Sequence, residues 1–249
     1  MYDAISIRFK EYESVSRQFL INKLPVIVRI DGKAFHTWTR NLNSPFDSDL
    51  MEAMNKTTEI ICKEMQGFKC AYVQSDEISI VLSDISHNVN TQAWFNNNRD
   101  KIISISSSLA SANFNSIVTN YPHLKHEAID RHGLAYFDSR AFNLPLHEVE
   151  NYLIWRYKDC VRNSLFSVAQ FNFSHKELMN KNQSDVHEML HTKGINWATD
   201  FSSWEKNGRF FWKPHEEENS GYAWLKETPD FTDIDFRQTI VNLIQGDIW

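Results

Sequence analysis

The chain has 249 residues, 42% apolar and 13% aromatic, which is enough for one large domain or two small ones with a packed core. Its net charge of −6 argues against a protein that binds nucleic acid over its whole surface. No apolar run approaches the roughly 20 residues of a membrane span, and the N-terminus lacks a signal-peptide pattern. The three widely spaced cysteines fit reduced thiols, so we expect a cytoplasmic protein without a disulfide framework or a zinc site.

Charge is distributed unevenly along the chain. Residues 1–40 hold seven Lys or Arg against four acids, whereas residues 200–249 hold ten acids against five Lys or Arg. A local basic face that binds phosphate and ordinary scattered surface charge are both consistent with this distribution.

Hydrophobic periodicity and turn residues predict alternating helices and strands in the first 145 residues. The predicted elements are a helix over 5–22, a strand over 26–31, an amphipathic helix over 47–66 ending at Gly67, two hairpin strands over 70–74 and 78–83, an Asn-rich loop over 87–100, a helix over 101–119 and a strand over 134–142. The resulting order β-α-β-β-α-β is the split βαβ, ferredoxin-like arrangement of an α+β fold.

The remainder of the chain is predicted to be mainly helical. After Pro145 we expect a long helix over about 147–170, then a polar segment and a Trp-rich end. Because no Pro/Gly/Ser-rich linker lies near residue 145, residues 1–145 are predicted to form an α+β part on which a helical part, residues 146–249, packs as one compact body.

Acidic residues stand where two predicted strands end. The apolar strand over 26–31 ends on Asp31, directly before Gly32, and Asp76 and Glu77 lie between the two hairpin strands. In a split βαβ sheet these strands are neighbours, so the two aspartates can meet in space. Paired carboxylates repel unless a cation lies between them, and Mg²⁺ prefers such oxygen ligands. Two Mg²⁺ ions about 4 Å apart would serve phosphoryl or nucleotidyl transfer.

Neighbouring residues fit the same interpretation. Gly32 allows a close backbone approach to a metal or phosphate, and Glu77 is either a third ligand or a group behind the ligands. Asp-Gly and Ser-Asp-Glu are also ordinary turn sequences, so each alone is better explained by structure. Their occurrence together on neighbouring strands favours the metal site. No P-loop, G-x-G-x-x-G or G-x-S-x-G motif is present.

Five stretches resemble the tRNA-His guanylyltransferase family in order and spacing. They are VIVRIDGKAFHTWTR, AYVQSDEISIVL, YFDSRAFNLP, NYLIWRYKDCVRNSL and FSHKELMNKNQ. The resemblance runs from about residue 8 to about residue 215 and is strongest to the bacterial, archaeal and phage branch of 3′-to-5′ polymerases. The RIDG…FH and QSDE motifs are the most specific part of it.

The resemblance implies a polymerase-type or cyclase-type palm that acts on the 5′ end of tRNA. ATP or GTP would activate that end, and the 3′-hydroxyl of an incoming nucleotide would then attack it. Two Mg²⁺ ions would be held by Asp31, the Gly32 backbone oxygen and Asp76, with Glu77 also catalytic. Homotetramers are usual in the family. The implied nucleotide contacts are Arg29, Asp31, Gly32, Lys33, Ala34, Phe35, His36, Ser75, Asp76, Lys101 and Asn163, with Arg99 and Arg140 as further phosphate candidates.

Two departures from the family pattern bear on the substrate. Val161 replaces the histidine that opens a block in the tRNA-His-specific enzymes, and Ser44 replaces a lysine before Pro45. The first departure favours template-dependent repair of 5′-truncated tRNAs over addition of G at position −1, which stays the alternative. A palm-fold nucleotide cyclase and a non-catalytic RNA-binding protein are more distant alternatives.

Overall fold

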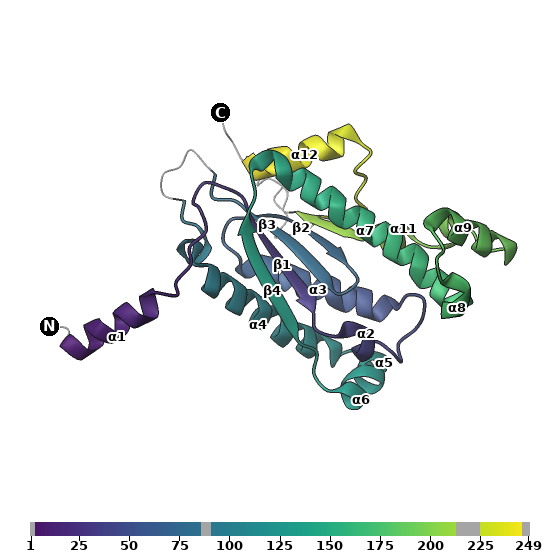
Figure 1. Cartoon of the computed structure of the whole chain (residues 1–249), viewed down its shortest axis with the longest axis horizontal. Coiled ribbons are helices and arrows are strands. Elements are labelled where there is room, and N and C mark those ends of the chain that lie inside the picture. The colour runs from purple at the N-terminus through teal and green to yellow at the C-terminus, as the bar shows by residue number, and fades with distance from the viewer. Residues whose placement is uncertain (1–2, 86–90, 213–224, 246–249) are drawn as a thin grey trace.

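The computed structural model describes residues 3–85, 91–212 and 225–245, and it contains one antiparallel sheet with helices on both faces (Figure 1). The sheet has the strand order β4-β1-β3-β2-β5-β6. The strands are β1 (Val26–Gly32), β2 (Phe68–Gln74), β3 (Glu77–Leu82), β4 (Phe137–Asn143), β5 (Arg209–Trp212) and β6 (Leu225–Glu227). Helix α3 connects β1 to β2, and α4 connects β3 to β4.

The helices of the described residues vary from single turns to one helix of 27 residues. They are α1 (Ala4–Ser14), α2 (Phe35–Trp38), α3 (Ser48–Glu64), the 3₁₀ turn η1 (Trp94–Asn97), α4 (Arg99–Val118), α5 (Pro122–Leu124), the π turn η2 (Lys125–Ile129), α6 (Asp130–His132), α7 (Leu146–Asn172), α8 (His175–Leu178), α9 (Gln183–Thr192), α10 (Trp197–Asp200), α11 (Ser203–Asn207) and α12 (Ile234–Gln245). None of them is both long enough and apolar enough to cross a lipid bilayer.

Strand β1 is buried on both faces because it lies inside the sheet. Val26, Val28 and Ile30 join the core under α3 and α4, while Ile27 joins the core under α7 and α12. Side chains alternate along a strand, so Asp31 lies on the α7 face. The end of β1 therefore places the Asp31 carboxylate on the side of the sheet that α7 covers.

The predicted helix over 47–66 is confirmed, with its start and end explained by local chemistry. The Asp47 side chain accepts a hydrogen bond from the Leu50 N–H at 3.0 Å and caps α3. Gly67 has φ = 81°, a conformation that glycine adopts without strain, and β2 begins at the next residue. The long predicted helix over about 147–170 is also confirmed, as α7.

The predicted N-terminal helix is too long, since α1 ends at Ser14 rather than at residue 22. Backbone hydrogen bonds to the segment around the start of α4 replace helical ones: Leu20 N–H donates to the Asn97 carbonyl at 2.8 Å, and Arg99 N–H donates to the Gln18 carbonyl at 2.9 Å. No residue of α1 is buried. After Ser14 the chain turns and then pairs with the segment at the start of α4, so tertiary pairing outweighs helix propensity there.

The C-terminal part is less helical than predicted, because β5 and β6 extend the sheet beyond β2. Strand β5 is four residues long and buried, so it carries no alternating pattern that would reveal it. The fourth predicted strand begins at Phe137 instead of residue 134. In the predicted Asn-rich loop, residues 94–97 form the turn η1, and residues 86–90 lie outside the described residues.

Candidate active site

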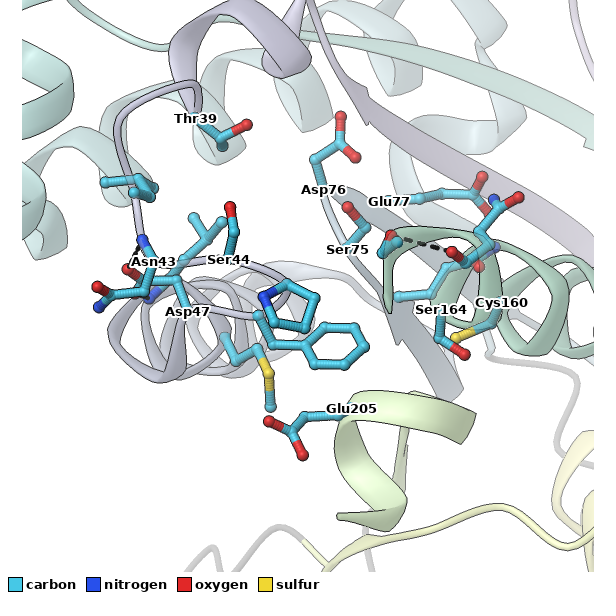
Figure 2. A pocket seen from close by; sticks show the side chains of 18 of the residues that line it. Thr39, Asn43, Ser44, Asp47, Ser75, Asp76, Glu77, Cys160, Ser164 and Glu205 are labelled. Atoms are coloured by element: carbon cyan, nitrogen blue, oxygen red, sulfur yellow. Dashed lines mark hydrogen bonds between the residues drawn. The ribbon is translucent and has the colours of Figure 1, made fainter. Parts of the chain in front are cut away.

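Asp31 and Asp76 meet at one end of the sheet. Antiparallel pairing of β1 with β3 places Asp31 opposite Glu77, and Asp76 is the preceding residue, in the turn between β2 and β3. Both aspartates line a cavity of about 500 Å³. Figure 2 shows Ser75 and Asp76 on one side of this cavity, with Asn43 and Ser44 facing them from the loop before α3. The topology thus brings together the two acids that the sequence singled out.

The electrostatics of the pair favour a bound cation. Burial raises the pKa of Asp31, and repulsion from Glu77 raises it further. Burial is also the main cause that raises the pKa of Asp76 to about 6, with a further contribution from Asp31. Each carboxylate is therefore costly to ionise without a compensating positive charge.

The donor set fits Mg²⁺ but not a metal held entirely by side chains. Within residues 3–85, 91–212 and 225–245, no group of three or more His, Cys, Asp or Glu is arranged to hold a metal ion. Mg²⁺ is usually bound by one or two carboxylates plus substrate phosphates and water, and does not need such a cage. Asp31 and Asp76 match that mode, and both line the cavity, whereas Gly32 does not.

Glu77 is held by an arginine from α7. The Arg156 Nε donates to Glu77 Oε1 at 2.7 Å, and Nη2 donates to Oε2 at 2.6 Å. The Ser79 hydroxyl donates to the same carboxylate at 3.1 Å. Both side chains of the ion pair are about nine-tenths buried. Because both carboxylate oxygens of Glu77 already accept hydrogen bonds, the arrangement favours a residue that supports the metal ligands over a third metal ligand.

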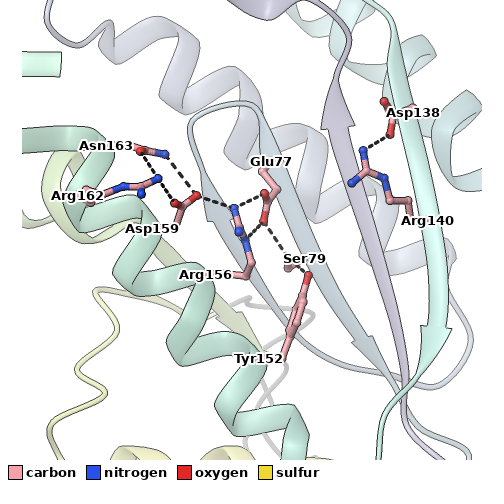
Figure 3. Close-up of polar contacts among 9 residues, drawn as sticks. All are labelled: Glu77, Ser79, Asp138, Arg140, Tyr152, Arg156, Asp159, Arg162 and Asn163. Carbon is pink, nitrogen blue, oxygen red and sulfur yellow. Dashed lines mark hydrogen bonds and ion pairs between the residues drawn. The ribbon is translucent and has the colours of Figure 1, made fainter. Parts of the chain in front are cut away.

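The α7 side of the cavity was missed by the sequence analysis except for Asn163. Arg156 also donates to Asp159 at 2.9 Å, and Asp159 accepts from Arg162 at 2.7 Å and from Asn163 at 3.4 Å (Figure 3). Arg156, Asp159 and Asn163 are spaced by three and four residues, which puts them on one face of a helix. Polar residues at this spacing, within a helix that is otherwise mostly apolar on its buried face, were the signal in the sequence.

Several predicted nucleotide contacts lie outside the cavity lining. Phe35 is buried among Trp38, Phe114 and Phe137, with ring centroids 5.2 to 5.6 Å away. Phe35 therefore serves the core. Its ring does not line the cavity that contains the two carboxylates.

The other predicted contacts are dispersed. Lys33, Ala34 and His36 are exposed on the turn after β1, where Ala34 has φ = 53° and starts α2. Lys101 is exposed in the first turn of α4. Arg29 is half-buried on the same face of β1 as Asp31. Of the predicted set, Asp31, Ser75, Asp76 and Asn163 line the cavity, and so does the catalytic candidate Glu77.

Gly32 is required by packing. A methyl group at its Cα would overlap with the Phe35 ring, which the aromatic cluster holds in place. We expect Gly32→Ala to lower the free energy of unfolding by about 1 to 3 kcal/mol, the usual cost of overpacking a core. Urea unfolding measures this, with Lys33→Ala as the control, because its exposed side chain should matter by less than about 0.5 kcal/mol. Equal stability of Gly32→Ala and the wild type would contradict the packing role.

Comparison with known proteins identifies the family. Residues 6–145 match the family model described as tRNAHis guanylyltransferase (Thg1). The chain belongs to the tRNA-His guanylyltransferase family. It is therefore a nucleotidyltransferase, as the sequence predicted.

Relatives from this guanylyltransferase family cover between about three quarters and nearly all of the chain. The tRNA(His) guanylyltransferase of Schizosaccharomyces pombe is 27% identical over 96% of this chain and 92% of its own length. The Kluyveromyces lactis enzyme is 30% identical over 73% of this chain and 79% of its own. A solved bacterial tRNA(His) guanylyltransferase-like protein in complex with ATP is 39% identical, with a TM-score of 0.85 over 97% of this chain and 99% of that one.

Proposed function

We propose that this protein adds nucleotides in the 3′-to-5′ direction to the 5′ end of tRNA, in a template-dependent manner, to repair 5′-truncated tRNAs. The observation that carries the proposal is the pair Asp31 and Asp76, which share a cavity of about 500 Å³ at the end of two adjacent strands. A nucleotidyl transfer centre needs carboxylates placed in this way beside room for a nucleotide.

Asp31, the Gly32 backbone oxygen and Asp76 would hold Mg²⁺, with ATP and GTP as nucleotide substrates. Bound Mg²⁺ would neutralise charge on the phosphates and lower the pKa of an attacking hydroxyl. Solved bacterial relatives in complex with ATP and with GTP, 39% and 38% identical, support the choice of nucleotides.

The residues around the acids have distinct proposed tasks. Ser75 and Asn163 offer polar groups to the nucleotide inside the cavity. Arg29, Lys33 and Lys101 would attract the triphosphate. Glu77 would keep the turn that carries Asp76 in place through its pair with Arg156. In this proposal Ala34, Phe35 and His36 shape the turn after β1 on which the nucleotide lies.

Ser44 lines the cavity in place of a lysine, so the cation that binds one triphosphate is left unassigned. One position, Val161 on α7, favours repair over addition of G at position −1, because the tRNA-His-specific enzymes have a histidine there. The greater identity to the bacterial guanylyltransferase-like protein, 39% against 27% and 30% for two fungal guanylyltransferases, points the same way.

The deciding experiment compares 5′-monophosphorylated tRNAs on a sequencing gel, with Mg²⁺, ATP or GTP, and all four nucleoside triphosphates. We expect truncated tRNAs to be extended with the nucleotide that pairs with the opposite strand, at least tenfold faster than full-length tRNA-His is extended. Faster addition of G to full-length tRNA-His, whatever base lies opposite, would favour the alternative. A product formed from nucleoside triphosphate alone, without RNA, would favour the cyclase.

The wider setting is part of the same proposal. The strand order β4-β1-β3-β2 with α3 and α4 on one face supports a ferredoxin-like palm. We also propose a homotetramer that acts in the cytoplasm.

A further inference from the structure

Trp155 on α7 is an exposed aromatic residue that packs against two buried side chains. Its side chain is 54% exposed, whereas Tyr152 and Arg156 beside it are 8% and 7% exposed. The Arg156 guanidinium carbon lies 4.5 Å from the centre of the indole, and the Tyr152 ring meets the indole edge-on at 5.8 Å. The indole is therefore held against the protein on one side and open to solvent on the rest.

The residues that hold Trp155 also hold the catalytic turn. Arg156 is bound to Glu77 through two hydrogen bonds, and Glu77 follows Asp76 directly. The Tyr152 hydroxyl lies 2.9 Å from the Ser79 hydroxyl, which in turn donates to Glu77. Arg156 lines the cavity of about 500 Å³ but Trp155 does not. The indole thus lies next to the proposed nucleotide cavity, outside it.

Two guanidinium groups lie on the same side of the sheet. Arg29 on β1 is directly opposite Arg140 on β4, so both side chains project from the face that carries Asp31. Both lower the pKa of Asp31, which places them within electrostatic reach of it. The Arg29 Nε is buried and makes no hydrogen bond within the described residues. Arg140 pairs with Asp138 at 3.6 Å, and both are more than half exposed (Figure 3).

We infer that Trp155 is the stacking platform for the 5′-terminal base of the RNA substrate. Stacking of a base on an aromatic side chain contributes about 1 to 3 kcal/mol, and the cation beneath the indole fixes its orientation. The free nucleotide occupies the cavity, so the base adjacent to it along the RNA lies at the cavity's border, beside Trp155. The guanidinium groups of Arg29 and Arg140 then meet the phosphates of that end. This inference rests on the proposed function.

A double-mutant cycle between protein and RNA tests the platform. Fluorescence anisotropy measures the Kd of full-length protein for a truncated tRNA and for the same tRNA with an abasic 5′-terminal nucleotide. We expect Trp155→Leu to raise Kd about tenfold on the intact RNA and less than twofold on the abasic RNA, with Trp155→Phe between wild type and Trp155→Leu. Phe171→Leu is the matched control, because Phe171 is 62% exposed on the same helix but outside the cavity lining.

Each outcome of this experiment has a distinct interpretation. The same loss of affinity on both RNAs, or no loss on either, overturns the inference. A Trp155→Leu effect confined to the KM of the nucleoside triphosphate assigns the indole to the free nucleotide and also overturns it. Thermal unfolding of each variant identifies losses caused by misfolding. Since the cycle reads binding, it still reports on Trp155 if wild-type protein fails to extend any tRNA, the result that would reject the proposed function instead.

Discussion

Asp76→Asn is expected to abolish nucleotide addition and, in Mg²⁺-free buffer at pH 7.5, to make the protein more stable. The pKa of Asp76 is raised to about 6 by burial and by Asp31, so its ionised form is unfavourable in the folded protein. The amide removes this cost of about 1 to 3 kcal/mol. The melting temperature should rise by roughly 2 to 8 °C, while addition falls at least a thousandfold because a proposed Mg²⁺ ligand is lost.

The pH dependence follows from the direction of the shift. Above about pH 6 the folded wild type carries the full penalty of ionised Asp76, and below the ordinary pKa of 3.8 neither state is ionised. The stability difference between Asp76→Asn and the wild type should therefore shrink as pH falls from 6 toward 4. Differential scanning at several pH values measures this difference. Asp130→Asn is the control, since Asp130 is about half exposed and should show no such trend.

The same reasoning applies to Asp31, whose pKa is also raised. Asp31→Asn should likewise abolish addition while leaving the fold intact. If either variant retained more than about a tenth of wild-type activity, a loss under 1.4 kcal/mol in transition-state stabilisation, that residue would not be a metal ligand.

Arg156→Met is expected to be strongly destabilising, and Arg162→Met is not. Arg156 and Glu77 form a buried ion pair, and removal of one partner leaves a buried uncompensated charge at a cost of about 3 to 5 kcal/mol. Arg162 pairs with Asp159 through a similar contact, but its side chain is 54% exposed. Such exposed pairs contribute about 0 to 1 kcal/mol. Urea unfolding of the two variants compares two arginines that both contact Asp159 from the same helix.

A double variant separates stability from chemistry at this pair. Replacing both partners, as in Glu77→Leu with Arg156→Met, removes the buried charges together and should recover most of the stability that Arg156→Met alone loses. We expect the double variant still to be at least a hundredfold slower than wild type, because the turn that carries Asp76 is no longer tied to α7. A stable double variant with wild-type rates would remove Glu77 from the catalytic set, and equal destabilisation by the two single Arg variants would contradict the buried-pair argument.

The acid pair could be predicted from the sequence, because each acid has a local sequence pattern and the strand order makes the two acids neighbours. Asp31 ends an apolar strand and Asp76 sits in a hairpin turn, and the register then places the first opposite Glu77. The role of Arg156 could not be predicted from the sequence. Its partner is 79 residues away, and the contact depends on the position and rotation of α7 over the sheet, which helical periodicity does not fix.

Elements near the two ends of the chain were also hard to predict, because long-range pairing defines them. Helix α1 stops at Ser14 because residues 18 and 20 hydrogen-bond to Arg99 and Asn97 at the start of α4, a long-range pairing without a sequence pattern. Strand β5 is defined by pairing with β2, and its four residues Arg209–Trp212 are too few for alternation to appear. Arg209 is fully buried within it, against the expectation for a charged residue, and donates to Asn55 at 2.9 Å.

The most direct test of the central claim is the position of the metal in crystals grown with Mn²⁺ and a non-hydrolysable ATP analogue. Mn²⁺ occupies oxygen sites that Mg²⁺ prefers, and its anomalous signal locates it independently of the protein phases. We expect an anomalous peak within coordination distance, about 2.0 to 2.4 Å, of carboxylate oxygens from both Asp31 and Asp76, next to the phosphates of the nucleotide. A nucleotide bound with its Mn²⁺ elsewhere, and neither aspartate as a ligand, would contradict the account.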